Sequence, residues 1–131
     1  MCIRDRKHLP EYIAARQVAA ASYDRQLSDI DGITIPHRIG NSTHVFHQYT
    51  IRVAASRRDA LRAHLSARGI PTGIYYPIPG HAQIAFESFE YNKKDFPESI
   101  GAAAEVLSLP MHTELTEDQQ LFICESIRIF V

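Results

Sequence analysis

Tryptophan is absent from the 131 residues, and no apolar run approaches the length of a membrane span. Arg4, Asp5, Arg6 and Lys7 near the amino terminus have no apolar segment behind them, so no secretory signal is indicated. The net charge is −1 and the basic residues are scattered, which disfavours nucleic acid or an anionic membrane surface as a partner. These absences predict a cytoplasmic protein that binds neither membranes nor nucleic acid.

Several kinds of catalytic site lack their usual residues. Cys2 and Cys124 lie far apart and no Cys-x-x-Cys occurs, so we expect free thiols and no disulfide. The sequence has no HExxH motif, no GxSxG elbow and no phosphate-binding glycine pattern. Lys7, Lys93 and Lys94 stand among charged or hydrophilic neighbours, unlike the desolvated lysine that Schiff-base chemistry needs. From these residues we assign no catalytic, cofactor-binding or metal-binding position.

Histidine is comparatively abundant, with seven residues, but its spacing argues against a metal site. His44 and His47 are three positions apart on an expected strand, so their side chains would point to opposite faces. His47 falls in line with the apolar positions of that strand, which predicts a hydrogen-bonded histidine in the core.

Composition and length favour one folded domain. The chain is 45% hydrophobic and 22% charged, as expected for a globular domain with its own core. Residues 1–6 do not continue the pattern that follows, and we interpret them as a non-native or disordered leader. The folded domain is then residues 7–131.

Hydrophobic periodicity predicts alternating helices and short strands. The expected helices are residues 7–31, 56–69, 97–107 and 116–130, with a short helical turn at 84–89. The expected strands are residues 33–36, 45–53, 70–76 and 108–111. The first connection between strands is a short loop, so we predict an α+β fold with a small antiparallel or mixed sheet of three to four strands packed by helices.

Capping signals support two of the helix starts. Ser56 with Asp59 resembles a capping box, and Thr116 with Gln119 forms the same pattern before the last helix. Pro97 is suited to the first turn of the helix that it begins.

The tract Gly69-Ile70-Pro71-Thr72-Gly73-Ile74-Tyr75-Tyr76-Pro77-Ile78-Pro79-Gly80-His81-Ala82-Gln83 is the main candidate for function. Its prolines confine the expected strand to an edge of the sheet and end it in a stiff turn. Tyr75, Tyr76, His81 and Gln83 follow one another closely, and such a group suits binding of a polyhydroxylated or anionic small molecule. A purely structural edge strand and surface turn remains the alternative.

Four segments in their order resemble the carboxy-terminal part of the DegT/DnrJ/EryC1/StrS family of sugar-nucleotide aminotransferases. These are HLPEYIAARQVAAASYDRQL, HVFHQYTIRV with RDALRAHLSARGI, PTGIYYPIPGHAQ, and FPES followed by EVLSLPMHTELTEDQ. The resemblance covers residues 7–131. It implies the small carboxy-terminal domain of the aspartate-aminotransferase fold, in which a separate large domain holds pyridoxal 5'-phosphate and the Schiff-base lysine.

The resemblance also implies a reaction and a site. Similar enzymes form homodimers and transfer an amino group, usually from glutamate, to a nucleotide-linked keto-sugar in amino-sugar or polysaccharide biosynthesis. In them the histidine matching His81 contributes to the sugar-nucleotide pocket, often across the dimer interface, with Tyr75, Tyr76 and Gln83 at neighbouring positions. Gly80 replaces the leucine common before that histidine, which loosens the loop.

We therefore expect the small-domain portion of such an aminotransferase, inactive without its large domain. The alternative from another class is a stand-alone, non-catalytic module that binds sugar nucleotides. An interaction domain that pairs through its exposed helices is a third possibility.

Overall fold

The structure is a computed structural model that describes residues 6–92 and 95–131. Its helices are α2 (Leu9–Leu27), α3 (Ala55–Ala67), α4 (Pro97–Glu105) and α5 (Glu117–Phe130), with 3-10 turns η1 (Gly80–Ala82) and η2 (Ile84–Phe89). Its strands are β1 (Ile33–Thr34), β2 (Tyr49–Val53) and β3 (Val106–Leu109). The predicted leader lies, apart from Arg6, outside the described residues.

The three strands form one antiparallel sheet in the order β1-β2-β3. Ile33 pairs with Val53, and Tyr49 pairs with Leu109. β2 and β3 are far apart in sequence, with α3 and α4 between them, so their pairing is a long-range contact. The arrangement confirms the predicted α+β fold with a small antiparallel sheet.

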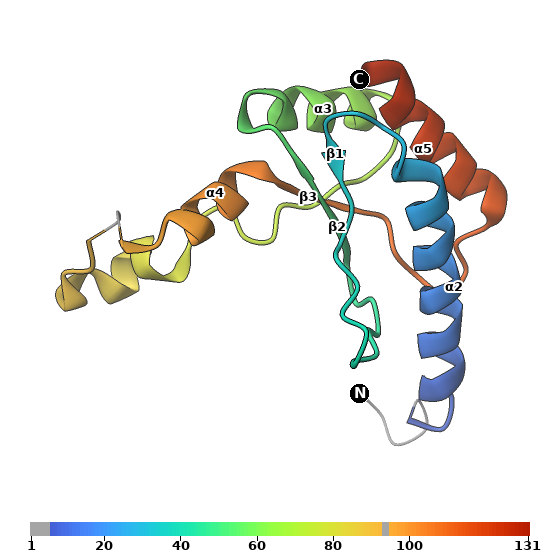
Figure 1. The fold of residues 1–131 in the computed structure, drawn as a ribbon, viewed down its shortest axis with the longest axis horizontal. Coiled ribbons are helices and arrows are strands. Elements are labelled where there is room, and N and C mark those ends of the chain that lie inside the picture. Colours follow the sequence, from blue (N-terminus) through green and yellow to red (C-terminus); the bar gives the residue numbers. More distant parts are fainter. Residues whose placement is uncertain (1–5, 93–94) are drawn as a thin grey trace.

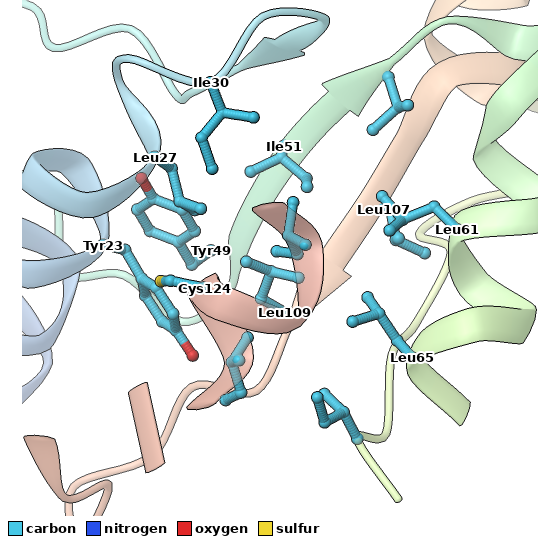
Figure 2. Packing of buried hydrophobic residues seen from close by; sticks show 14 of the residues in the cluster. Tyr23, Leu27, Ile30, Tyr49, Ile51, Leu61, Leu65, Leu107, Leu109 and Cys124 are labelled. Carbon is cyan, nitrogen blue, oxygen red and sulfur yellow. The ribbon is translucent and has the colours of Figure 1, made fainter. Parts of the chain in front are cut away.

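Helices α2, α3 and α5 enclose the core together with the sheet (Figures 1 and 2). α5 packs against both α2 and α3, and α3 also contacts β3. The buried side chains of β2 alternate with exposed ones, because successive residues of a strand point to opposite faces. The largest fully buried side chains are Tyr23, Leu27, Phe46, Tyr49, Ile51, Leu61, Leu65, Leu107 and Ile127.

Residues 78–92 and 95–105, which include η1, η2 and α4, form an arm that extends away from this core (Figure 1). At its α4 end the arm contacts α3 and β2. Hydrophobic periodicity predicts an inner face of Ile100, Ala103, Ala104 and Leu107 for the helix at residues 97–107. In the structure none of the side chains of α4 is buried, and Leu107 lies in β3. The expected helical turn at residues 84–89 is confirmed, but Ile84 is 89% exposed and does not pack the loop down. The exposed large apolar residues of the arm are Ile78, Ile84, Phe86, Phe89, Tyr91, Phe96 and Ile100.

Of the two predicted capping boxes, one is confirmed and one is wrong. Thr116 accepts a hydrogen bond from the backbone of Gln119, whose side chain accepts one from the Thr116 backbone, at 3.2 and 3.0 Å. α3 begins at Ala55, with Ala54 as its N-cap and no side-chain cap. Ser56 is already inside the helix, so its hydroxyl is past the position from which it could cap.

The strand predicted for residues 45–53 begins only at Tyr49, and His47 is exposed. Phe46 has a positive φ of 46° and is 1% exposed. Its side chain therefore points into the core, while those of Val45 and His47 are exposed. The His44 Nδ1 atom accepts a hydrogen bond from the Phe46 backbone N–H at 2.8 Å, which stabilises this turn. The prediction that His47 is a core histidine is therefore wrong, because the alternation of strand residues starts after the turn.

Tyr23, Tyr49 and Cys124 form the polar centre of the core (Figure 2). The Tyr23 hydroxyl donates to the Pro110 carbonyl at 2.9 Å, and the Tyr49 hydroxyl donates to the Asp24 carboxylate at 2.7 Å. Burial raises the pKa of the Cys124 thiol to about 12, and Arg128 opposes this shift. Burial also raises the pKa of both tyrosines above 10.0, and the Asp24 hydrogen bond adds to the shift of Tyr49.

These shifts predict that the domain loses stability in alkali. The folded state keeps all three groups protonated, whereas the unfolded chain releases the thiol proton near pH 9.0 and the phenol protons near pH 10.0. The unfolded state then binds fewer protons, so the free energy of unfolding falls as pH rises above 9 toward the raised pKa values. Urea unfolding followed by circular dichroism at a series of pH values measures this fall.

Cys124→Ala separates the thiol from the tyrosines. This variant should lose the part of the decline that begins near the ordinary thiol pKa of 9.0, and retain the part that begins near 10.0. A free energy of unfolding that stays constant up to about pH 11 in the unsubstituted chain would contradict the burial of all three groups.

Among the described residues, no helix combines the length and the apolar character needed to cross a bilayer.

Candidate functional site

The tract that joins α3 to the arm is mostly irregular, and the predicted strand at residues 70–76 is wrong. α3 ends before Gly69, which has a positive φ of 75° as expected of a glycine after a helix. Only Gly73 pairs with the sheet, as an isolated antiparallel bridge to Ser108 in β3. Pro71 has no backbone N–H to donate and Pro77 follows soon after, so a longer ladder cannot form.

Past Tyr76 the chain turns into η1. The Ala82 N–H donates to the Pro79 carbonyl at 2.9 Å, and the Gln83 N–H donates to the Gly80 carbonyl at 3.1 Å. His81 and Gln83 are close to the two tyrosines in sequence. After this short 3-10 turn, however, the two side chains lie in different surroundings.

A cavity of about 350 Å³ lies between this tract and α4. Ser99, Ala102 and Ala103 of α4 form one side, and they occupy one helix face because residues three and four apart are neighbours. Their small side chains leave the space open. The remaining wall residues are Tyr75, Tyr76, Ile78, Pro79, Gly80, Gln83 and Val106.

Three of the four predicted site residues therefore meet at one cavity. Tyr75 and Tyr76 are 48% and 72% exposed, and their rings make an edge-to-face contact with centroids 5.9 Å apart. Aromatic faces of this kind can cover a sugar or base ring, and the Gln83 amide can donate to and accept from hydroxyl groups. The arrangement can hold a polar ring compound, but it brings together no nucleophile and base.

His81 does not line this cavity. Its imidazole stacks on Phe96, with ring centroids 4.5 Å apart and an interplanar angle of 27°. The Nε2 atom of His81 is buried and has no hydrogen-bond partner within the described part of the chain. The structure thus separates His81 from Tyr75, Tyr76 and Gln83.

Sequence reasoning missed the contribution of α4 to the site. Three residues of α4 line the cavity, and of these only Ala103 belongs to the predicted inner face of the helix. The available signal was the spacing of small residues at 99, 102 and 103, which indicates a helix face that a ligand or another chain segment can approach closely.

A second hollow of about 330 Å³ also has Tyr75 in its lining. It is lined by His47, Gln48, Pro71, Thr72, Gly73, Tyr75, Ser108, Leu109, Pro110 and Met111. Tyr75 is the residue that lines both spaces. In the described residues no group of three or more His, Cys, Asp or Glu side chains is placed to hold a metal ion.

Comparison with known proteins places these features in a family. The sequence profile of the DegT/DnrJ/EryC1/StrS aminotransferase family matches residues 2–128. The chain is 44% identical over 125 residues to a pleiotropic regulatory protein of Geobacillus stearothermophilus, covering 94% of the chain and 33% of that protein. It is 41% identical over 121 residues to the UDP-N-acetyl-3-dehydro-alpha-D-glucosamine 3-aminotransferase of Acidithiobacillus ferrooxidans, covering 92% and 31%.

Solved structures of known proteins share this fold. The S. venezuelae protein DesV, solved in complex with a ketimine intermediate, superposes with a TM-score of 0.90 at 34% identity, over 95% of this chain and 33% of DesV. A DegT DnrJ EryC1 StrS aminotransferase from Brucella abortus superposes with a TM-score of 0.88 at 33% identity, over 98% and 33%. The chain spans about a third of the length of the curated relatives it matches. The matched profile and the shared fold establish that the chain belongs to the DegT/DnrJ/EryC1/StrS aminotransferase family.

Proposed function

We propose that this chain is the small carboxy-terminal domain of a cytoplasmic, homodimeric aminotransferase that transfers an amino group, from a donor such as glutamate, to a nucleotide-linked keto-sugar. The cavity between the tract and α4 carries the proposal, because it gathers two exposed tyrosine rings and an amide beside small residues. Relatives named for UDP-linked and dTDP-linked sugars support this class of substrate. The chain then supplies one wall of the sugar-nucleotide site.

Pyridoxal 5'-phosphate is the cofactor that the family implies, and the residues described here do not fit it. A Schiff base requires a lysine whose amine is desolvated and deprotonated. Lys7 is exposed, and Lys93 and Lys94 lie outside the described residues. We therefore assign the cofactor to a large domain that this chain does not include.

His81 keeps a binding role in this proposal, although it does not line the cavity. Its buried Nε2 atom has unused hydrogen-bonding capacity, and its stacking on Phe96 holds the ring in one orientation. We expect this atom to meet a group of the ligand or of a second subunit, as the buried polar atom is otherwise unsatisfied.

The first test is the response to the cofactor. With added pyridoxal 5'-phosphate, the purified chain is expected to show no saturable Schiff-base absorbance and no transamination. Lys7→Arg serves as the matched control for adventitious reaction at an exposed amine. A stable Schiff-base band that saturates at one equivalent would contradict the assignment of the cofactor to another domain.

The second test is the ligand. In NMR titrations with UDP- and dTDP-linked sugars, we expect backbone shifts centred on Tyr75, Tyr76 and Gln83, with a dissociation constant on the order of millimolar because only one wall is present. Tyr76→Ala should weaken this binding, whereas Tyr12→Ala, at an exposed tyrosine of α2 outside the cavity, should not. Shifts scattered over the surface would contradict the site. Saturable micromolar binding by the chain alone would favour the stand-alone binding module instead.

A further inference from the structure

Gly73 is held firmly against the sheet. Its N–H donates to the Ser108 carbonyl at 3.0 Å, and the Ser108 N–H donates to the Gly73 carbonyl at 2.7 Å. Ser108 is itself 3% exposed, and its hydroxyl is hydrogen-bonded to that of Thr50 at 2.8 Å. The backbone at position 73 therefore has little freedom to move.

The ring of Tyr75 lies where a side chain at position 73 would stand. A Cβ atom added to Gly73 would be 2.5 Å from Cε2, 2.6 Å from Cζ and 2.7 Å from the hydroxyl of Tyr75. Carbon atoms in contact prefer separations of about 3.5–4.0 Å, so the ring and a β-carbon cannot coexist in these positions. Gly73 does not have the positive φ found at Gly32 and Gly69. The neighbouring ring, and not the backbone conformation, is what a side chain at this position would displace.

We propose that Gly73 is a positioning residue: because it has no side chain, the Tyr75 ring can lie against it and form the wall between the two hollows. Tyr75 lines both of them, so the place of its ring determines how wide each one is. A larger residue at position 73 would push the ring toward the cavity that we assign to the sugar nucleotide, or out of contact with it. The role of Gly73 in ligand binding rests on the proposed function, whereas its effect on the position of the Tyr75 ring does not.

The experiment compares Gly73→Ala with Gly40→Ala by NMR. A Cβ at Gly40 would meet nothing within 4 Å, so this variant makes the same change at an open site. In the unsubstituted chain we expect nuclear Overhauser contacts between the Tyr75 ring and the Gly73 α-protons, and ring-current shifts of those protons. Gly73→Ala should abolish the native ring contacts while the Ser108 amide stays protected from exchange, because the end of a tyrosine side chain can move more easily than the sheet.

Binding provides the functional readout. Gly73→Ala should raise the dissociation constant for the nucleotide sugar by about fivefold or more, and Gly40→Ala by less than about twofold. In a Tyr75→Ala background Gly73→Ala should have no further effect, because an interaction through one side chain disappears with it.

The outcomes separate the two ideas. Absent ring contacts in the unsubstituted chain, or an equal loss of binding with and without Tyr75, would overturn the positioning role. Ring contacts that Gly73→Ala removes, in a chain that binds no nucleotide sugar, would support the positioning role and overturn the proposed ligand.

Discussion

Tyr49→Ala is expected to lower the free energy of unfolding by on the order of 5 kcal/mol, the largest effect of the substitutions considered. Tyr49 is fully buried, and its ring packs against Tyr23 with centroids 4.8 Å apart. The substitution leaves a cavity where α2 meets β2, and it removes the hydrogen bond to Asp24. Urea unfolding at neutral pH measures the loss.

Tyr49→Phe divides this effect into its parts. It keeps the ring and removes only the hydroxyl, so the expected cost is about 1.5–3 kcal/mol, the range for a hydrogen bond to a charged group. Asp24 keeps its Arg38 partner, whose Nε atom is 2.9 Å from the carboxylate, so no buried charge is left alone. If Tyr49→Ala cost no more than Tyr49→Phe, the packing of the ring would not be stabilising the domain.

Phe46→Ala should cost about 3–5 kcal/mol. The side chain is 1% exposed, the Arg38 guanidinium lies 4.1 Å from its ring centroid, and the His44 ring lies 4.2 Å away. Phe46 thereby anchors the loop before β2 to the core. Urea unfolding should show a lower midpoint. Hydrogen exchange followed by NMR should show faster amide exchange in residues 37–48.

Phe89→Ala is the matched control. Phe89 belongs to the arm and is 63% exposed, so the same chemical change removes little buried surface and should cost less than about 1 kcal/mol. Similar losses for Phe46 and Phe89 would show that the arm packs against the core more closely than its exposure indicates.

The sequence was sufficient for the elements whose signals are local. The alanine-rich run of α2, the Thr116 capping box and the proline that begins α4 each act within a few residues, and the structure confirms all three. The α+β class also followed from the order of the elements. The resemblance that led to the family rested on segments that local folding preserves, and the profile match confirms it.

The candidate site was predictable only in part. Tyr75, Tyr76 and Gln83 are close in sequence, and the cavity brings them together with α4. His81 is equally close in sequence, but the 3-10 turn directs it toward Phe96. Which member of a short tract faces a cavity depends on one turn of backbone, and residue type alone does not determine it.

Tertiary contacts decided the remaining features. Alternating apolar residues indicated a strand through His47, but the positive φ of Phe46 moved that side chain inward and left His47 exposed. Likewise the sequence indicated that Gly73 is an ordinary strand residue. In the structure the Tyr75 ring occupies the space that a side chain at position 73 would need.

The helices and the Thr116 cap follow from the sequence alone because their stabilising interactions join near neighbours. The predicted Ser56 cap does not form, because α3 begins one residue earlier. The inward turn of Phe46, the single bridge at Gly73 and the cavity wall on α4 arise from packing between distant residues, whose energies appear only once the chain has folded.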